Sequence, residues 1–142
     1  MCFSVYIGTE KELELGKFVP EQTDIYFEKL TDEEEENLRP KFSKTNIYYV
    51  GSDTNCSCGL SLEFINPKEN MSNQSPTKFL ELLNEMTLNE DIEFYCCLEG
   101  DWSLPIEKTR EIDIREISIE KNYFGLTEKE FIKFKQQTTK WQ

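Results

Sequence analysis

The chain contains no histidine among its 142 residues. Imidazole is the base of Ser-His-Asp and Cys-His catalytic sites and a common ligand of zinc. The sequence therefore excludes these catalytic arrangements and any zinc site that uses imidazole. Sulfur is the remaining choice for a reactive or metal-binding centre, and the chain has five cysteines.

Long apolar runs are also missing. No stretch approaches the roughly 20 apolar residues of a membrane-spanning helix. The first eight residues lack the basic region and the long apolar region of a signal peptide. We therefore expect a cytoplasmic protein. Since the cytoplasm keeps thiols reduced, we expect the cysteines to be free, metal-bound or catalytic, and their odd number agrees with this.

Basic residues are few relative to acidic ones, 16 against 28, which gives a formal net charge of −12. Such a surface repels the phosphates of nucleic acids and of anionic membranes, so we expect neither as a partner. A basic protein partner is compatible with this charge. Solubility alone also explains it.

The length of 142 residues suits one domain, and neither a linker-like segment nor an internal repeat divides it. We therefore expect a single domain over residues 1–142. Aromatic residues make up 13% of the chain, while aliphatic residues are scarce. Phe and Tyr must therefore supply much of the core.

Alternating and β-branched patterns predict most of the strands. Strand-like segments lie at residues 2–7, 24–30, 45–50, 60–65, 92–98 and 111–119. We expect residues 45–50 and 60–65 to form a hairpin across the loop between them. In the last segment the isoleucine alternation shifts phase, which predicts a bulge or bend near Arg115–Glu116.

Three sequence signals predict helices. Thr31 to Glu34 forms a capping box that opens a helix over residues 32–38, which Pro40 ends. Ser75 as N-cap and Pro76 open the main helix, with one apolar stripe to about residue 88. A second capping box, Thr127 to Glu130, predicts a short last helix through Phe134.

These segments together predict an α+β fold. We expect an antiparallel or mixed sheet of five or six strands, with the main helix (about residues 75–88) packed on one face. Segregated strands and few helices, without a regular strand–helix–strand rhythm, favour this class over a doubly wound fold.

The loop of residues 51–59 carries the most unusual chemistry. Gly51 and Gly59 give the backbone freedom, and Cys56 and Cys58 are spaced to face the same side of an extended segment. Cys2 would be a third donor if the first strand lies beside this loop. Cys2, Cys56 and Cys58 are therefore a candidate thiolate site for a soft metal such as zinc, although structural zinc requires four ligands.

Other interpretations of the cysteines remain open. Cys56 and Cys58 could form an easily reduced disulfide, or they could be two thiols without a ligand. Cys2, exposed by removal of Met1, could act as an N-terminal nucleophile, or it could simply be buried. Cys96 and Cys97 are adjacent in a strand, so only one of them can face any given site.

Two further segments allow both a structural and a functional interpretation. The acidic run of residues 32–36 suits a helix N-terminus, and it would also suit a cation or a basic partner. Gly100-Asp101-Trp102 predicts a turn followed by a core aromatic residue, and it could equally be a binding corner with an exposed Trp.

Several motifs resemble a known family. The motifs are Met1-Cys2 before a strand, Tyr49-Val50-Gly51-Ser52 before Cys56-x-Cys58-Gly59, Glu99-Gly100-Asp101, and an Ile-rich segment before an aromatic C-terminus. Together they resemble a family of small uncharacterised bacterial proteins, over most of the chain. The resemblance implies that the cysteine loop matters, and it assigns no catalytic residue.

Two functional hypotheses follow. The first is a non-enzymatic cytoplasmic binding module with an acidic surface that attracts a basic protein, for example a toxin-neutralising immunity protein. The second is metal binding or thiol redox chemistry at Cys2, Cys56 and Cys58. The second hypothesis requires the three sulfur atoms to lie within about 4 Å of one another.

Overall fold

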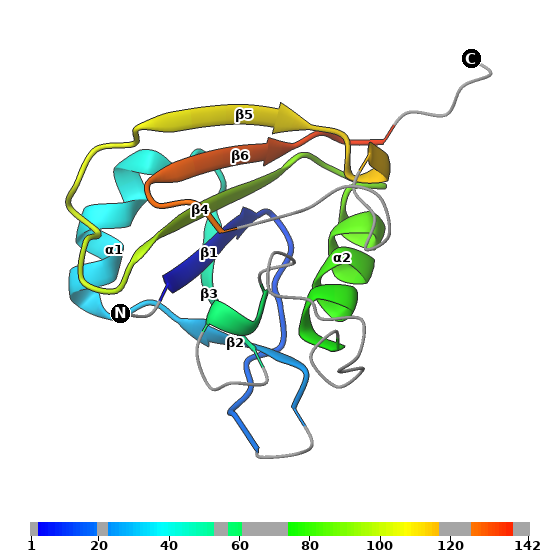
Figure 1. The fold of residues 1–142 in the computed structure, drawn as a ribbon, viewed down its shortest axis with the longest axis horizontal. Coiled ribbons are helices and arrows are strands. Elements are labelled where there is room, and N and C mark those ends of the chain that lie inside the picture. Colours follow the sequence, from blue (N-terminus) through cyan, green and yellow to red (C-terminus); the bar gives the residue numbers. More distant parts are fainter. Residues whose placement is uncertain (1–2, 20–22, 53–56, 61–73, 117–125, 138–142) are drawn as a thin grey trace.

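The computed structural model describes residues 3–19, 23–52, 57–60, 74–116 and 126–137, with the backbone alone described for residues 58, 59, 74 and 76. Six strands form one mixed sheet in the order β2-β3-β1-β4-β6-β5 (Figure 1). All neighbours are antiparallel except β5 and β6, which are parallel. The strands are β1 (Phe3–Thr9), β2 (Ile25–Lys29), β3 (Asn46–Ser52), β4 (Ile92–Leu98), β5 (Lys108–Ile112) and β6 (Glu130–Phe134).

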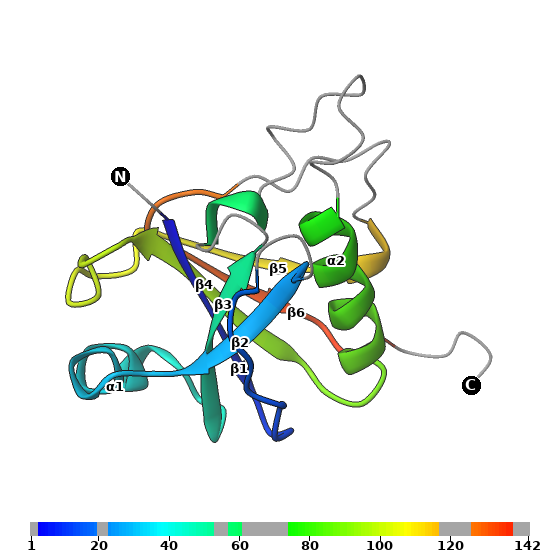
Figure 2. The ribbon, with the colours of Figure 1, turned by 90° about the horizontal axis from the view of Figure 1, so that it is seen from below.

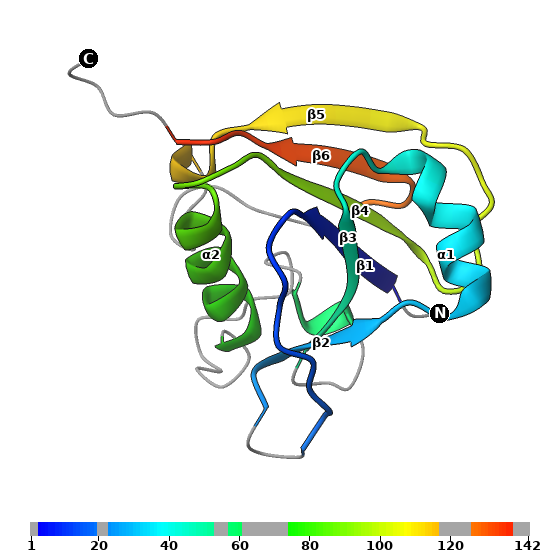
Figure 3. The ribbon, with the colours of Figure 1, turned by 180° about the vertical axis from the view of Figure 1, so that it is seen from behind.

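Two α-helices cover opposite faces of this sheet (Figures 2 and 3). They are α1 (Asp32–Leu38) and α2 (Gln74–Met86), and within the described residues short 3-10 turns cover residues 39–41, 57–60 and 114–116. The α+β class, the mixed sheet and the helix packed on one face are thereby confirmed. No helix in the described part of the chain is long and apolar enough to cross a membrane.

The larger core lies between α2 and the sheet, on what we call the α2 face. Phe79, Leu83 and Met86 of α2 are buried there, at the helical spacing that the sequence shows. Phe94 of β4 lies at the centre, with its ring centroid 6.2 Å from that of Phe79 and 5.8 Å from that of Phe134. Aromatic rings therefore carry much of this core, as the composition predicts.

The smaller core lies between α1 and the opposite face of the sheet, the α1 face. Leu38 of α1 packs there with strand residues whose neighbours point into the larger core. Those strand residues are Tyr6, Ile47, Tyr95, Cys97 and Phe131. Strands β1, β4 and β6 are thus buried on both faces, so apolar residues stand at consecutive positions in them, such as Phe131 and Ile132 in β6.

Burial on both faces explains the wrong prediction for the last element. Residues 130–134 form strand β6 and not a helix. Ile132 packs into the larger core and Phe131 into the smaller one. Such an apolar run matches a helical stripe as well as a strand. The supposed cap residue Glu130 instead lies at the strand start, in ion pairs with Arg110 and Lys108 of β5.

The predicted hairpin of residues 45–50 and 60–65 is also wrong. Both edges of β3 are occupied, by β1 on one side and by β2 on the other. Residues 57–60 turn as a 3-10 helix beneath this sheet, and residues 61–65 lie outside the described part. A sequence pattern favours pairing with the next strand along the chain. Here β1 and β2, which both precede β3, pair with it instead.

Other boundaries differ by smaller amounts. Strand β1 continues past residue 7, through Gly8 to Thr9. A side chain at Gly8 would place its Cβ 2.7 Å from a ring carbon of Phe42, so this position requires glycine. Strand β5 begins at Lys108 and ends at Ile112, and the 3-10 turn at residues 114–116 fits the predicted bend near Arg115. Gly100, with φ of +93°, makes the predicted turn.

Ser57 ties the 3-10 turn to the two central strands. Its hydroxyl oxygen accepts from the Val5 backbone N–H at 2.9 Å and donates to the Val50 carbonyl at 2.5 Å. All three residues are buried. The hydroxyl thus satisfies one backbone donor and one backbone acceptor at the point where the β1–β3 ladder begins.

We expect Ser57→Ala to lower the free energy of unfolding by about 2–4 kcal/mol, because two buried backbone groups lose their partner. Chemical denaturation followed by circular dichroism measures this. The control is Ser103→Ala, because Ser103 is exposed. Ser43 does not serve as a control, because its hydroxyl donates a hydrogen bond to Glu93. Ser103→Ala should change stability by less than about 0.5 kcal/mol. Equal effects of the two substitutions would contradict the role of Ser57.

Candidate functional site

The predicted metal site of three cysteines lies largely outside the described residues. Cys2 and Cys56 lie outside the described residues, and for Cys58 only the backbone is described, within the turn at residues 57–60. Among the described residues, no group of three Cys, Asp or Glu side chains is arranged to hold a metal. The thiolate site of Cys2, Cys56 and Cys58 therefore stays a prediction.

Cys96 and Cys97 occupy opposite faces of β4, as their adjacency predicts. Cys96 belongs to the larger core and Cys97 to the smaller, and both are buried. Burial, together with the charge of Asp101, raises the pKa of the Cys97 thiol to about 12. Cys97 is thus held as a neutral thiol and is a poor nucleophile.

A pocket of about 570 Å³ opens on the α1 face, where β2, β3 and the start of β1 meet the start of α1. We call it the α1 pocket. Five of its lining residues are aromatic, three are acidic and two are basic. They are Phe3, Phe18, Tyr26, Tyr49 and Trp102, then Glu28, Glu34 and Glu99, then Lys17 and Lys29, with Ser4 and Thr31 completing the wall.

The floor of the α1 pocket is built from tyrosine rings laid on a glycine. Tyr26 of β2 is paired with Gly51 of β3, and a methyl group at Gly51 would lie 2.0 Å from the Tyr26 ring. The ring of Tyr26 therefore lies directly on the bare β3 backbone. Its centroid is 6.3 Å from that of Tyr49 and 6.3 Å from that of Phe18.

The sequence predicts that Gly51 gives a loop its backbone freedom, but the structure shows a different role for this residue. It lies inside β3, and its conformation is not the left-handed one that loop glycines often adopt. The missing side chain makes room for Tyr26, which is only 6% exposed. Close approach of a ring, and not backbone freedom, requires glycine here.

The inner wall carries the carboxylate of Glu34, which is 9% exposed. The predicted capping box is confirmed: the Thr31 hydroxyl accepts from the Glu34 backbone N–H, and one Glu34 oxygen accepts from the Thr31 backbone N–H at 2.8 Å. The other carboxylate oxygen accepts from the Tyr6 hydroxyl at 2.5 Å. Two hydrogen bonds from separate elements therefore fix the carboxylate in place.

Glu34 has no counter-ion within the described part of the chain, since none of the ion pairs found there includes it. The same holds for the other two carboxylates of the pocket, Glu28 and Glu99. A buried carboxylate is costly unless hydrogen bonds and an opposite charge compensate it. The hydrogen bonds are present at Glu34, and the opposite charge is what a ligand would supply.

Trp102, which follows β4 in the chain, lines the pocket, and Lys41 lies next to it. The Lys41 ammonium donates to the Trp102 carbonyl at 3.0 Å and lies 5.8 Å from the centre of the Tyr95 ring. Burial lowers the pKa of Lys41. The Tyr95 hydroxyl and the Trp102 indole N–H are buried without a hydrogen-bond partner among the described residues.

Two other hollows are less suited to a specific ligand. One, of about 750 Å³, lies between residues 11–17, β2 and α2, and no buried charged side chain lines it. The other, of about 490 Å³, has three glutamates, of which Glu90 is in an ion pair with Lys44 and Glu10 accepts bonds from Thr45. The α1 pocket alone, of these three, has a buried carboxylate that lacks a counter-ion.

The sequence does not predict the α1 pocket, although its motifs contain several of the pocket's parts. The capping box located Glu34, and Trp102 was weighed as a binding corner. The link between them depends on strand register, which places Tyr49 opposite Tyr6 and Glu28 opposite Tyr49. No local pattern encodes this juxtaposition of residues from β1, β2, β3 and α1.

No family model, no curated protein and no solved structure matches this chain. The resemblance to a family of small bacterial proteins therefore stays a prediction.

Proposed function

We propose that the protein is a non-enzymatic cytoplasmic binding module whose α1 pocket and the acidic residues around it bind a basic protein partner. An immunity protein that neutralises a basic toxin would be one such module. The observation that carries this proposal is the buried carboxylate of Glu34, which lines an open pocket and lacks a counter-ion among the described residues.

The surroundings of the pocket support the same partner chemistry. Glu28 and Glu99 are exposed at its rim, and Asp32, Glu33 and Glu36 are exposed on the adjoining helix α1. With a chain charge of −12, this region attracts positively charged proteins over a distance and raises their association rate. The aromatic rings of the pocket then provide the contact area that charges alone do not give.

Titration with a basic peptide, ten residues of alternating arginine and serine, tests the proposal. The triple variant Glu28→Gln, Glu36→Gln, Glu99→Gln removes three exposed charges next to the pocket. We expect it to bind the peptide at least about tenfold more weakly than the unaltered protein, with the difference shrinking in 0.5 M salt. Calorimetry measures both affinities.

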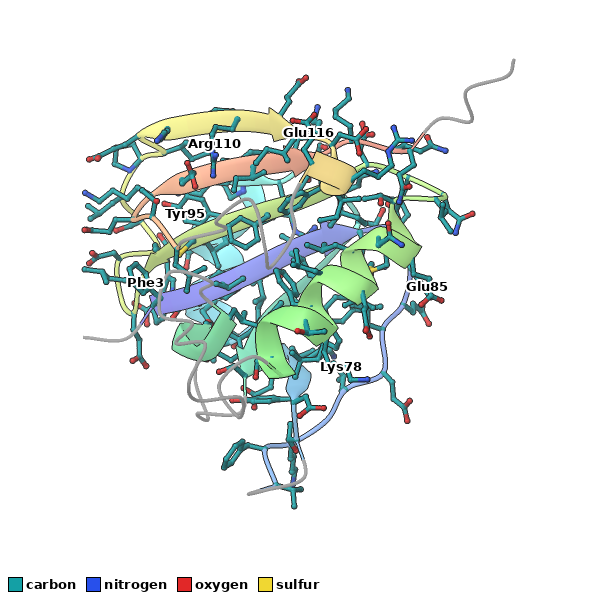
Figure 4. All side chains as sticks on the ribbon, turned by 45° about the vertical axis from the view of Figure 1, so that its right-hand side comes forward. Phe3, Lys78, Glu85, Tyr95, Arg110 and Glu116 are labelled. Carbon is teal, nitrogen blue, oxygen red and sulfur yellow. The ribbon has the colours of Figure 1, made fainter. Side chains whose placement is uncertain are left out.

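The matched control removes three exposed carboxylates elsewhere, with Glu81→Gln, Glu85→Gln and Glu111→Gln. Glu85 lies on the solvent side of α2 (Figure 4), and Glu111 is on the edge strand β5, across the sheet from β2. Net charge changes equally in the two triple variants. Equal weakening would mean that the peptide responds to total charge, and the proposed binding face would be abandoned.

A further inference from the structure

The α1 pocket combines a buried carboxylate with aromatic rings. These two features can distinguish one basic side chain from another. We propose that it binds the guanidinium group of an arginine side chain presented by the partner, with Glu34 as the charge acceptor and the rings of Tyr26 and Tyr49 as the stacking surface. This inference rests on the proposed function and names the group that the same site recognises.

Geometry favours guanidinium over ammonium. Guanidinium is planar, weakly hydrated and stacks on aromatic faces, whereas ammonium is compact and strongly hydrated. Tyr26 lies directly on the β3 backbone at Gly51, and Tyr49 stands beside it at 6.3 Å between ring centroids. Fixed rings of this kind accept a planar cation without rearrangement.

Glu34 provides the specific contact. Each of its oxygens accepts one hydrogen bond, from the Thr31 N–H and from the Tyr6 hydroxyl, and a carboxylate oxygen can accept a second. Both oxygens therefore retain acceptor capacity for the paired N–H groups of a guanidinium. Because Tyr6 and Thr31 hold the carboxylate, it does not have to be ordered when the ligand binds.

The two lysines of the pocket do not oppose this assignment. Lys17 and Lys29 are exposed, and neither forms an ion pair with another described residue. Their ammonium groups are solvated, so water and salt screen their repulsion of a cation. Glu34, in contrast, is buried, where electrostatic interactions are screened much less.

The test uses blocked single amino acids with the full chain. The probes are N-acetylarginine methylamide, the corresponding lysine compound, and the citrulline compound, which keeps the shape of arginine and lacks its charge. The chain has two tryptophans, so Trp141→Phe leaves Trp102 as the single fluorescent reporter at the pocket wall. We expect saturable binding of the arginine probe with a dissociation constant on the order of 1 mM.

The three probes should differ in affinity. The citrulline probe should bind at least about tenfold more weakly than the arginine probe, and the lysine probe several times more weakly. Glu34→Gln should weaken arginine binding at least about tenfold, while Glu111→Gln on β5 leaves it unchanged. Tyr49→Leu, which removes one ring and keeps the carboxylate, should also weaken it. This variant serves if Glu34→Gln does not fold.

Three outcomes would overturn the inference. They are equal affinity for the arginine and citrulline probes, tighter binding of the lysine probe, and arginine binding that neither Glu34→Gln nor Tyr49→Leu affects. The proposed function is tested separately. The protein could bind the basic peptide through Glu28, Glu36 and Glu99 and yet not bind the arginine probe. In that case the proposed binding module is retained, and only the assignment of the pocket to guanidinium is wrong.

Discussion

Gly51→Ala should lower the free energy of unfolding by about 3 kcal/mol and displace Tyr26 from the floor of the α1 pocket. The added methyl group would lie 2.0 Å from one ring carbon of Tyr26 and 2.2 Å from another. The blocking atoms belong to the hydroxyl end of the Tyr26 ring, and because the ring is rigid and only 6% exposed, it has to move as a whole to make room. Either β3 and β2 separate, or Tyr26 turns out and loses its buried surface.

Gly16→Ala is the matched control for this substitution. It adds the same methyl group near the same residue, and the nearest atom, Tyr26 Cβ, is 3.8 Å away, which is an ordinary contact. We expect its effect on stability to stay within about 0.5 kcal/mol. In the double variant Gly51→Ala, Tyr26→Ala the strain should disappear, so that it is no less stable than Tyr26→Ala alone. Denaturation curves of the four proteins decide this, and a Gly51→Ala protein as stable as Gly16→Ala would refute the close packing of Tyr26 on β3.

Glu34→Ala should lower the free energy of unfolding by about 2–4 kcal/mol. The substitution removes half of the capping box of α1 and leaves the Tyr6 hydroxyl buried without its acceptor. Burial, the hydrogen bond to Glu34 and its negative charge all raise the pKa of Tyr6, so this hydroxyl remains a donor at physiological pH. Without Glu34, the Tyr6 hydroxyl would therefore be a buried donor without its acceptor in the smaller core.

A double-mutant cycle with Tyr6→Phe separates the two effects. Glu34→Ala in the Tyr6→Phe background should cost at least about 1 kcal/mol less than in the unaltered protein, because the unsatisfied hydroxyl is gone. Glu33→Ala changes an exposed neighbour in the same helical turn and should cost less than about 1 kcal/mol. A Glu34→Ala protein no less stable than the Glu33→Ala protein would show that the Tyr6–Glu34 contact contributes nothing.

Elements defined by local chemistry were predicted well from the sequence. The capping box at Thr31 begins α1 where expected, and the apolar run at residues 92–98 is strand β4. Helix α2 begins and ends within two residues of its predicted limits. In each case, residues close in sequence decide the structure, so a local pattern is sufficient.

Elements decided by distant partners were predicted poorly. Strand β6 depends on pairing with β4 and β5, and its apolar residues are shared between two cores. The capping pattern at Thr127 was a local signal that tertiary structure overrides, and Lys129 there takes a positive φ of 58°. Strand β3 likewise pairs with strands from earlier in the chain and not with the following segment.

The candidate site shows the same division. Composition predicts a site made of sulfur, because the chain has five cysteines and no histidine. The α1 pocket is made instead of common residues, Glu and Tyr, whose chemistry becomes unusual only through burial. Tyr6 and Glu34 are 28 positions apart, and only the fold brings the hydroxyl to the carboxylate.

Intermolecular nuclear Overhauser effects between a bound arginine side chain and the protein test the central claim most directly. With N-acetylarginine methylamide labelled with ¹³C at its δ-carbon, the claim predicts contacts from the δ-protons to the ring protons of Tyr26 and Tyr49. These contacts should vanish in Glu34→Gln. Contacts confined to the side-chain methylene protons of the exposed acidic residues of α1, or none at saturating probe, would contradict the claim that the α1 pocket is a site for guanidinium.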